Sequence, residues 1–405
     1  MDKIAKIMLN WKALIPLIVL LAIMYWAAPT VFRRVRSYYP LADRDLSGWG
    51  TMDRETATSL QSALDAEVNR LGVPGLQVSI QTDDGLTWSG VSGTTDPERR
   101  IPLRREHIIR VGSVTKTFTA VIILQLVEEG KLSLDDPLSE WFPDFPNAEG
   151  ITVRDMLTHR SGIFNNLESP VVLGSLFFPR KVWQPQEMVD IAAREKLHAQ
   201  DEYYYSNTNY ILLGLIAEQI TGQDAATLYR KKIFEPLGLH DTYFVPYENA
   251  PENLISGYDR DMVPLPGLIE MKPDYVSAAT SAYTSGAMVS SADDLVKFYD
   301  ALFTGHLLSS TSLDEMTTFF DAHDEGLPQI TGYGLGLFRL EVGGEEVWTS
   351  IGFFIGSTTM VAYSPSEKDI VAIIGNLSLY EFVSVWENLT KISRAGPNLN
   401  QGNDR

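Results

Sequence analysis

The chain has 405 residues, of which 44% are hydrophobic and 21% charged, so its composition is that of a folded protein rather than a disordered one. Its 33 lysines and arginines are outnumbered by 52 aspartates and glutamates, and the resulting net charge of -19 disfavours binding to a nucleic-acid backbone. The chain has no cysteine, which excludes disulfides, thiolate metal sites and a cysteine nucleophile.

The first 44 residues differ from the rest of the chain. Twenty uncharged and mostly apolar residues run from Ala13 to Phe32, about the length of a helix that crosses a bilayer. A cleaved signal peptide is the alternative, but two bulky aromatic residues precede the small pair at 27–28, which favours an uncleaved anchor. Basic residues flank the span on both sides and leave its orientation open. We expect a single-pass membrane anchor over residues 1–44 and a polar connector over 45–54.

A helix and a hairpin are the first elements predicted beyond the connector. Apolar residues recur at helical spacing from Thr56 to Leu71, and Gly72 closes the segment. Apolar and polar residues then alternate over 76–81, and the alternation resumes after the Asp84-Gly85 turn, which indicates two antiparallel strands.

The middle of the chain is predicted to be rich in helices and the C-terminal part rich in strands. An apolar helix runs from Val114 to Glu129, and helical patterns interrupted by proline and glycine continue to about residue 330. Three later runs predict antiparallel strands, and a final segment predicts a closing helix: Leu335–Val342, Gly356–Tyr363, Asp369–Leu377 and Leu379–Ile392.

Both ends of the domain over 55–395 are therefore expected to build one sheet, while the middle forms a helical lobe. The α/β lobe comprises about residues 55–112 and 285–395, the helical lobe about 113–284, and 396–405 form a polar tail. A cleft between two lobes is the default place for a site.

Ser113 and Lys116 are the first residues that indicate chemistry. If Ser113 begins the helix that follows, Lys116 lies on the same face and its amine can serve as a base for the serine hydroxyl. The helix N-terminus also offers free N–H groups to a developing oxyanion. A helix-capping serine followed by an exposed lysine is the alternative, because this spacing also arises by chance.

The segment from Tyr203 to Gly214 supports the catalytic interpretation. A phenol at Tyr205 is able to relay the Ser113 proton to a leaving group, and the amide of Asn207 is able to bridge the lysine and a substrate carbonyl. An aromatic residue packed in the core is the alternative for Tyr205.

Together these segments resemble the serine β-lactamase-related superfamily, in particular the branch of class C β-lactamases, DD-peptidases and family VIII esterases. Three further blocks resemble it in the same order, at 157–163, 233–239 and 285–295. The resemblance covers about residues 55–390 and implies an α/β fold in which an antiparallel sheet is flanked by helices and carries an all-helical insertion.

The resemblance also implies acyl transfer without a metal or an organic cofactor. Ser113 attacks a carbonyl, Lys116 accepts its proton, Tyr205 shuttles protons, and water hydrolyses the acyl-Ser113 intermediate. Lys116 can act as a base only when neutral, so we expect its pKa to be lowered in the fold.

The third motif departs from the family pattern. Relatives carry Lys-Thr-Gly, His-Thr-Gly or His-x-Gly on a strand beside the site, whereas this chain has Ser350-Ile351-Gly352. The resemblance implies that Gly352 permits close backbone approach and that the N–H groups of Phe353 and Ser113 form the oxyanion hole. Without the lysine or histidine of the family motif, a substrate carboxylate has no cationic partner at Ser350. This favours neutral esters or amides as substrates, unless an arginine from elsewhere in the chain supplies the cation. The predicted substrate-binding residues are Asn207, Ser350, Gly352 and Phe353.

The six histidines show no metal-ligand spacing, and we interpret His159 as a polar residue that satisfies a buried turn. The leading prediction is a membrane-anchored serine hydrolase that acts on a small ester, amide or peptide, with its catalytic domain outside the cytoplasm. The alternatives are a cell-wall DD-peptidase or β-lactamase, and an inactive ligand-binding sensor or scaffold with the same fold. Apart from the substrate and the membrane, the sequence indicates no partner and no oligomeric state.

Overall fold

The computed structural model describes residues 33–35, 50–98, 101–170, 172, 177–260, 268–324, 326–378 and 381–396. The predicted anchor and connector, apart from 33–35 and 50–54, lie outside the described residues, and so does the predicted tail after residue 396. None of the helices in the described part of the chain combines the length and the apolar character that a membrane span needs.

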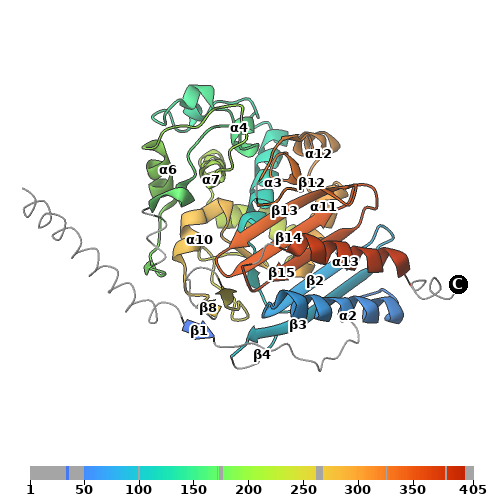
Figure 1. The fold of residues 1–405 in the computed structure, drawn as a ribbon. Coiled ribbons are helices and arrows are strands. Elements are labelled where there is room, and N and C mark those ends of the chain that lie inside the picture. Colours follow the sequence, from blue (N-terminus) through green and yellow to red (C-terminus); the bar gives the residue numbers. More distant parts are fainter. Residues whose placement is uncertain are drawn as a thin grey trace, which may run out of the picture.

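A nine-stranded antiparallel sheet lies at the centre of the structure, with the strand order β10-β11-β12-β13-β14-β15-β2-β3-β4 (Figure 1). β15 pairs with β2, so the N-terminal hairpin joins the C-terminal strands in one sheet, as the sequence predicts. The strands are β2 (Gly75–Gln81), β3 (Thr87–Asp96), β4 (Ile101–Pro102), β10 (Phe320–Asp321), β11 (Ile330–Tyr333), β12 (Phe338–Val342), β13 (Glu345–Phe354), β14 (Ser357–Tyr363) and β15 (Ile370–Gly375).

The sequence predicts three strands in the C-terminal part, and β13 is not one of them. Gly343 and Gly344, both with positive φ, form a two-residue turn that pairs Val342 with Glu345, so a hairpin rather than a loop follows β12. Polar residues and Gly352 interrupt the alternation of apolar and polar residues along β13, so the sequence pattern does not predict this strand.

Helices cover both faces of the sheet because its strands are apolar on both sides. On β15, Val371 and Ile373 belong to the core beneath α2 (Arg54–Leu71) and α13 (Phe382–Ala395), and Figure 1 shows these two helices together over the sheet. The alternate residues of β15 belong to the opposite core, which includes α3 (Thr115–Glu128) and α11 (Ala292–Phe303). The helix α2 begins after the N-cap Asp53 and ends at Gly72, whose φ is 61°.

The helical region packs around α3, whose residues from Thr115 to Leu124 are all buried. The predicted helical lobe over 113–284 is not all-helical, because the short strands β6, β7 and β8 lie within it. Together with short strands outside it, they form two small sheets, β1-β8-β7 and β5-β9-β6. The other described helices, in this region and next to it, are η1 (Gly112–Val114), η2 (Leu138–Glu140), η3 (Ala148–Gly150), α4 (Val153–Leu157), η4 (Asn166–Glu168), α6 (Pro185–Ala193), α7 (Asn207–Thr221), α8 (Ala225–Tyr229), η6 (Arg230–Phe234), α9 (Glu235–Leu237), α10 (Ser277–Ala282), η7 (Tyr283–Ser285) and α12 (Ser310–Met316). The short strands are β1 (Arg33–Val35), β5 (Ile109–Arg110), β6 (Tyr243–Phe244), β7 (Gly257–Asp259), β8 (Leu268–Met271) and β9 (Met288–Ser290).

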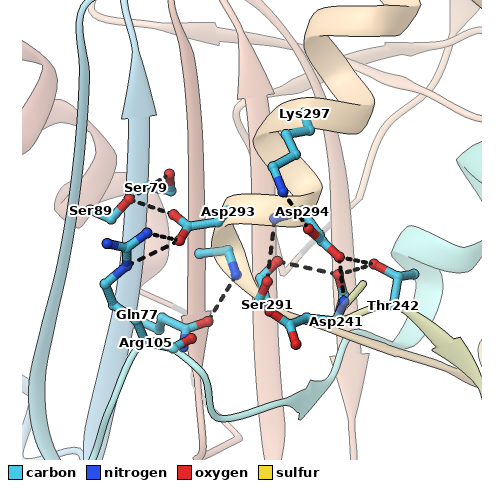
Figure 2. A network of polar contacts seen from close by, with 12 residues as sticks. Gln77, Ser79, Ser89, Arg105, Asp241, Thr242, Ser291, Asp293, Asp294 and Lys297 are labelled. Carbon is cyan, nitrogen blue, oxygen red and sulfur yellow. Dashed lines mark hydrogen bonds and ion pairs between the residues drawn. The ribbon is translucent and has the colours of Figure 1, made fainter. Parts of the chain in front are cut away.

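The start of α11 joins distant parts of the chain through a polar network (Figure 2). Asp293 accepts hydrogen bonds from Ser89 of β3 and from Arg105, whose Nη2 lies 2.5 Å from the carboxylate. The neighbouring Asp294 accepts a hydrogen bond of 3.1 Å from Thr242. The first turn of α11 therefore fixes the sheet relative to the segments that lead to the site.

Candidate active site

Ser113 lies in the short helix η1, between strand β5 and helix α3. Gly112 makes the turn with a φ of +51°, and a Cβ atom there would lie 2.7 Å from the carbonyl oxygen of Phe353. Only glycine fits this position without displacing the backbone. The turn thus places Ser113 at the N-terminal end of α3, as the sequence predicts.

Lys116 is fully buried one helical turn after Ser113. Its Nζ lies 3.0 Å from Ser113 Oγ, 2.7 Å from Asn207 Oδ1 and 2.8 Å from the carbonyl oxygen of Ser285. Burial lowers the pKa of Lys116 well below its usual value, and no described carboxylate offsets that effect. A neutral amine donates two hydrogens to Asn207 and Ser285 and accepts the Ser113 proton on its lone pair. The geometry fits a base and not an exposed lysine behind a helix cap.

Tyr205 lies beside this pair in the loop that leads into α7. Burial raises the pKa of its phenol above the usual value, while a hydrogen bond with Ser113 opposes the rise. The Lys116 Nζ lies 4.8 Å from the centre of the Tyr205 ring. Tyr205 therefore stays protonated at neutral pH and contacts the serine hydroxyl, which is the arrangement a proton relay needs.

Asn207 begins α7 and is held in place by a residue that sequence reasoning missed. Its backbone N–H and its side-chain Nδ2 both donate to Asn165 Oδ1, at 3.2 and 3.1 Å. This fixes the amide so that Oδ1 faces Lys116. The sequence block that contains Ser285 hints at the carbonyl that binds Lys116, but no local pattern points to Asn165.

His159 holds the same loop through hydrogen bonds to its backbone. Its Nδ1 accepts a hydrogen bond of 3.2 Å from the Ser206 N–H, and its carbonyl oxygen accepts one of 2.8 Å from the Tyr204 N–H. Its ring centre lies 4.3 Å from that of Tyr205. Burial lowers the pKa of His159 well below its usual value, so the imidazole is neutral. His159 thereby positions Tyr205 through the backbone on either side of it.

Gly352 allows strand β13 to approach η1 closely. A Cβ atom at this position would lie 1.9 Å from the Val111 carbonyl oxygen and 3.2 Å from the Ser113 nitrogen. From the other side, a Cβ atom on Gly112 would lie 3.3 Å from the Phe353 nitrogen. The peptide nitrogens of Ser113 and Phe353 therefore both lie beside this close contact, where two N–H donors are able to serve one oxyanion.

A cavity of about 240 Å³ opens at Ser113. Of the four predicted substrate-binding residues, Asn207 and Phe353 line the cavity. Ser350, which is only 3% exposed, and Gly352 do not line it. Among the described residues that line the cavity there is no charged side chain; the full lining is Gly112, Ser113, Leu167, Val172, Asn207, Ala278, Ser281, Ala282, Gly286, Phe353, Phe354 and Ile355. The described lining of the cavity is therefore uncharged and mostly apolar.

Arg110 lies behind this cavity rather than in it. Its guanidinium carbon lies 5.1 Å from the centre of the Phe354 ring, and its Nη2 donates to the Pro273 carbonyl oxygen at 2.8 Å. Burial lowers the pKa of Arg110 to about 10. Arg110 borders a separate, small cavity of about 20 Å³, so it does not stand at the position of the cation that the third motif lacks.

The fold and the Ser113–Lys116 pair together define a serine hydrolase. A model of the Beta-lactamase family matches residues 60–384, so the chain belongs to that family. This confirms the resemblance found in the sequence.

Curated relatives and solved structures agree with this assignment. The chain is 28% identical to Penicillin-binding protein 4* of Bacillus subtilis (strain 168) over 293 residues, which cover 69% of this chain and 63% of that protein. It is 27% identical over 277 residues to Esterase EstB of Burkholderia gladioli, covering 61% of this chain and 70% of that one. A crystal structure of D-amino acid amidase from Ochrobactrum anthropi SV3, complexed with L-phenylalanine amide, superposes with a TM-score of 0.77 at 28% identity, covering 84% of this chain and 99% of that one. The protein is therefore an enzyme, and the alternative of an inactive sensor or scaffold is not supported.

Proposed function

We propose that this protein hydrolyses esters or amides of small, uncharged acyl groups through a covalent acyl-Ser113 intermediate. The observation that carries the proposal is the fully buried Lys116 amine, 3.0 Å from the Ser113 hydroxyl. An uncharged amine at this distance is a base already in contact with the proton it must remove.

The chemical steps follow from these contacts. Ser113 Oγ attacks the substrate carbonyl carbon while its proton moves to Lys116 Nζ, and the N–H groups of Ser113 and Phe353 stabilise the oxyanion. The bond to the alcohol or amine then breaks, Tyr205 donates its proton to the leaving group, and Lys116 returns a proton to Tyr205. Water cleaves the acyl-Ser113 ester by the same proton transfers in reverse.

The cavity supports the substrate class. Its described lining is mostly apolar and uncharged, so a carboxylate next to the scissile bond finds no cation. The relatives include one protein named an esterase and one named an amidase. Together these observations favour neutral esters and amides over substrates that carry a carboxylate at the site.

The direct test is a burst experiment on the full-length protein with p-nitrophenyl butyrate. We expect a burst of nitrophenol and the mass of one added butyryl group, both lost in Ser113→Ala and both kept in Ser62→Ala, a serine on the exposed side of α2. Equal background rates in folded wild type and Ser113→Ala contradict the proposal. Covalent labelling by a fluorescent penicillin without ester turnover favours a DD-peptidase or β-lactamase instead.

The proposal includes a single-pass anchor formed by residues 13–32 and a catalytic domain outside the cytoplasm. The length and apolar character of this segment support the anchor, and family resemblance supports the location. Protease protection of sealed membrane vesicles tests both, because an extracytoplasmic domain is digested from only one side of the membrane.

A further inference from the structure

Three large apolar side chains are exposed within six residues of the chain, between η4 and α6. Phe177 is 38% exposed, Phe178 69% and Val182 55%. Two cations lie between them: Lys181, whose Nζ lies over the Trp183 ring, and Arg180. We refer to residues 177–182 as the aromatic loop. Apolar residues gathered in this way, with cations among them, indicate a contact surface rather than ordinary solvent exposure.

The aromatic loop packs on the segment between β8 and α10. The carbonyl oxygen of Pro179 accepts a hydrogen bond of 2.9 Å from the Ser277 N–H, and Arg180 pairs with Asp274 at 2.5 Å. The preceding strand β8 pairs with β1, with Arg33 opposite Glu270. Figure 1 shows β1, β8 and α10 on one side of the molecule.

The strand β1 is where the predicted anchor joins the folded domain. Arg33 follows directly on the apolar segment that runs from Ala13 to Phe32. An anchor helix that ends at Phe32 therefore brings the bilayer to the side of the molecule that carries β8 and the aromatic loop.

The active-site cavity lies on the same side. The small cavity beside the aromatic loop is lined by Pro179 and Lys272, and it shares Ala278, Phe354 and Ile355 with the cavity at Ser113. The small cavity beside the loop and the acyl cavity therefore share part of one wall.

We propose that the aromatic loop inserts Phe177, Phe178 and Val182 into the bilayer surface beside the anchor, so that the Ser113 cavity takes its substrate from the membrane interface. Aromatic side chains favour the boundary between headgroups and acyl chains, and Arg180 and Lys181 can reach the phosphates from the same loop. The substrates are then amphiphilic esters or amides that partition into lipid. The inference rests on the proposed anchor and hydrolase activity and adds the orientation of the domain and the source of its substrate.

The absence of cysteine makes the insertion measurable with single labelled positions in the full-length protein. Phe178→Cys carries an environment-sensitive nitrobenzoxadiazole label, and Leu86→Cys, 40% exposed before β3, is the control. Tyr258 of β7 donates a hydrogen bond to the Thr95 carbonyl oxygen, so the β1-β8-β7 sheet lies at the opposite end of β3 from Leu86. In phosphatidylcholine vesicles, spin-labelled lipids are expected to quench the label at 178 and not at 86. Equal quenching at both positions, or none at 178 in protein that floats with the vesicles, overturns the insertion while leaving the hydrolase and the anchor intact.

Activity provides the second readout. The double variant Phe177→Ser and Phe178→Ser is expected to cleave a water-soluble butyrate ester at the wild-type rate and a vesicle-embedded long-chain ester several-fold more slowly, whereas Leu86→Ser changes neither rate. Equal rates on the embedded ester overturn the membrane source of the substrate. Protein that fails to float with vesicles refutes the anchor together with this inference, and the burst at Ser113 tests the hydrolase independently of both.

Discussion

Lys116 illustrates how burial changes the proton affinity of a common side chain. In water its ammonium form is stable up to a pH near 10, but in this fold the chain encloses it completely and supplies only uncharged partners. When the amine is neutral, the Asn207 amide and the Ser285 carbonyl accept its two hydrogens, and its lone pair is free to face Ser113. Burial thus favours the neutral amine that the proposed mechanism needs.

The pH dependence of the reaction should report this base. We expect kcat/KM to rise with pH through a pKa below the usual lysine value of about 10.4, because only the neutral amine accepts the proton. Lys116→Arg remains protonated and should lose about 10²- to 10⁴-fold in kcat, whereas the surface substitution Lys131→Arg should change nothing.

The stability of the fold should also rise with pH up to the ordinary lysine pKa, since the unfolded chain binds the proton more tightly. An unchanged ascending limb in Lys116→Arg contradicts the assignment.

At the scale of elements, the site depends on the contact between strand β13 and helix η1. Gly112 on one side and Gly352 on the other leave no room for a side chain, and this brings the N–H groups of Ser113 and Phe353 together. The strand that the sequence pattern missed is therefore the one that carries the second donor of the proposed oxyanion hole.

Gly352→Ala tests this contact. The added methyl group would meet the Val111 carbonyl oxygen at 1.9 Å, so β13 or η1 has to shift and the two N–H groups separate. We expect kcat to fall by about 10²- to 10³-fold, the effect of losing one oxyanion donor. Gly344→Ala in the β12–β13 turn, with a φ of +85° and no atom within 4 Å, should cost about 1 kcal/mol of stability and leave kcat unchanged. Wild-type kcat in Gly352→Ala would exclude the proposed oxyanion hole.

At the scale of the whole molecule, the start of α11 holds together segments far apart in the sequence. Asp293 binds Ser89 and Arg105, and Asp294 binds Thr242, so one helical turn joins the N-terminal hairpin to the middle of the chain (Figure 2). Burial alone would raise the pKa of Asp293, but the hydrogen bonds from Ser89 and Arg105 outweigh it and lower the pKa below its usual value.

This network should make the fold sensitive to acid. The stabilisation from Asp293 is complete above the unfolded-state pKa of about 4 and is lost as the pH falls through the lower pKa of the folded state. Asp293→Asn should reduce the free energy of unfolding by about 2 kcal/mol at neutral pH and flatten its decline in acid. Denaturant unfolding at several pH values measures both, with the exposed Asp144→Asn as the control. The same acid slope in Asp293→Asn and wild type contradicts the role given to this carboxylate.

The amino-acid sequence predicts those features that depend on neighbouring residues. The spacing of Ser113 and Lys116 is a property of one helical turn, and the periodic patterns of α2, the β2–β3 hairpin, α3 and α13 follow from which faces they bury. The motif around Tyr205 and Asn207 is equally local, because a single loop and the first turn of α7 carry both residues.

The residues that complete the site become visible in the three-dimensional packing alone. Ser285 and Asn207 reach Lys116 from 169 and 91 positions away, and Asn165 fixes Asn207 from another loop. Ser350, placed at the substrate by its motif, is buried outside the cavity. These contacts depend on how strands and helices pack at ångström distances, and that packing depends on every element of the core together, which no local pattern of residues records.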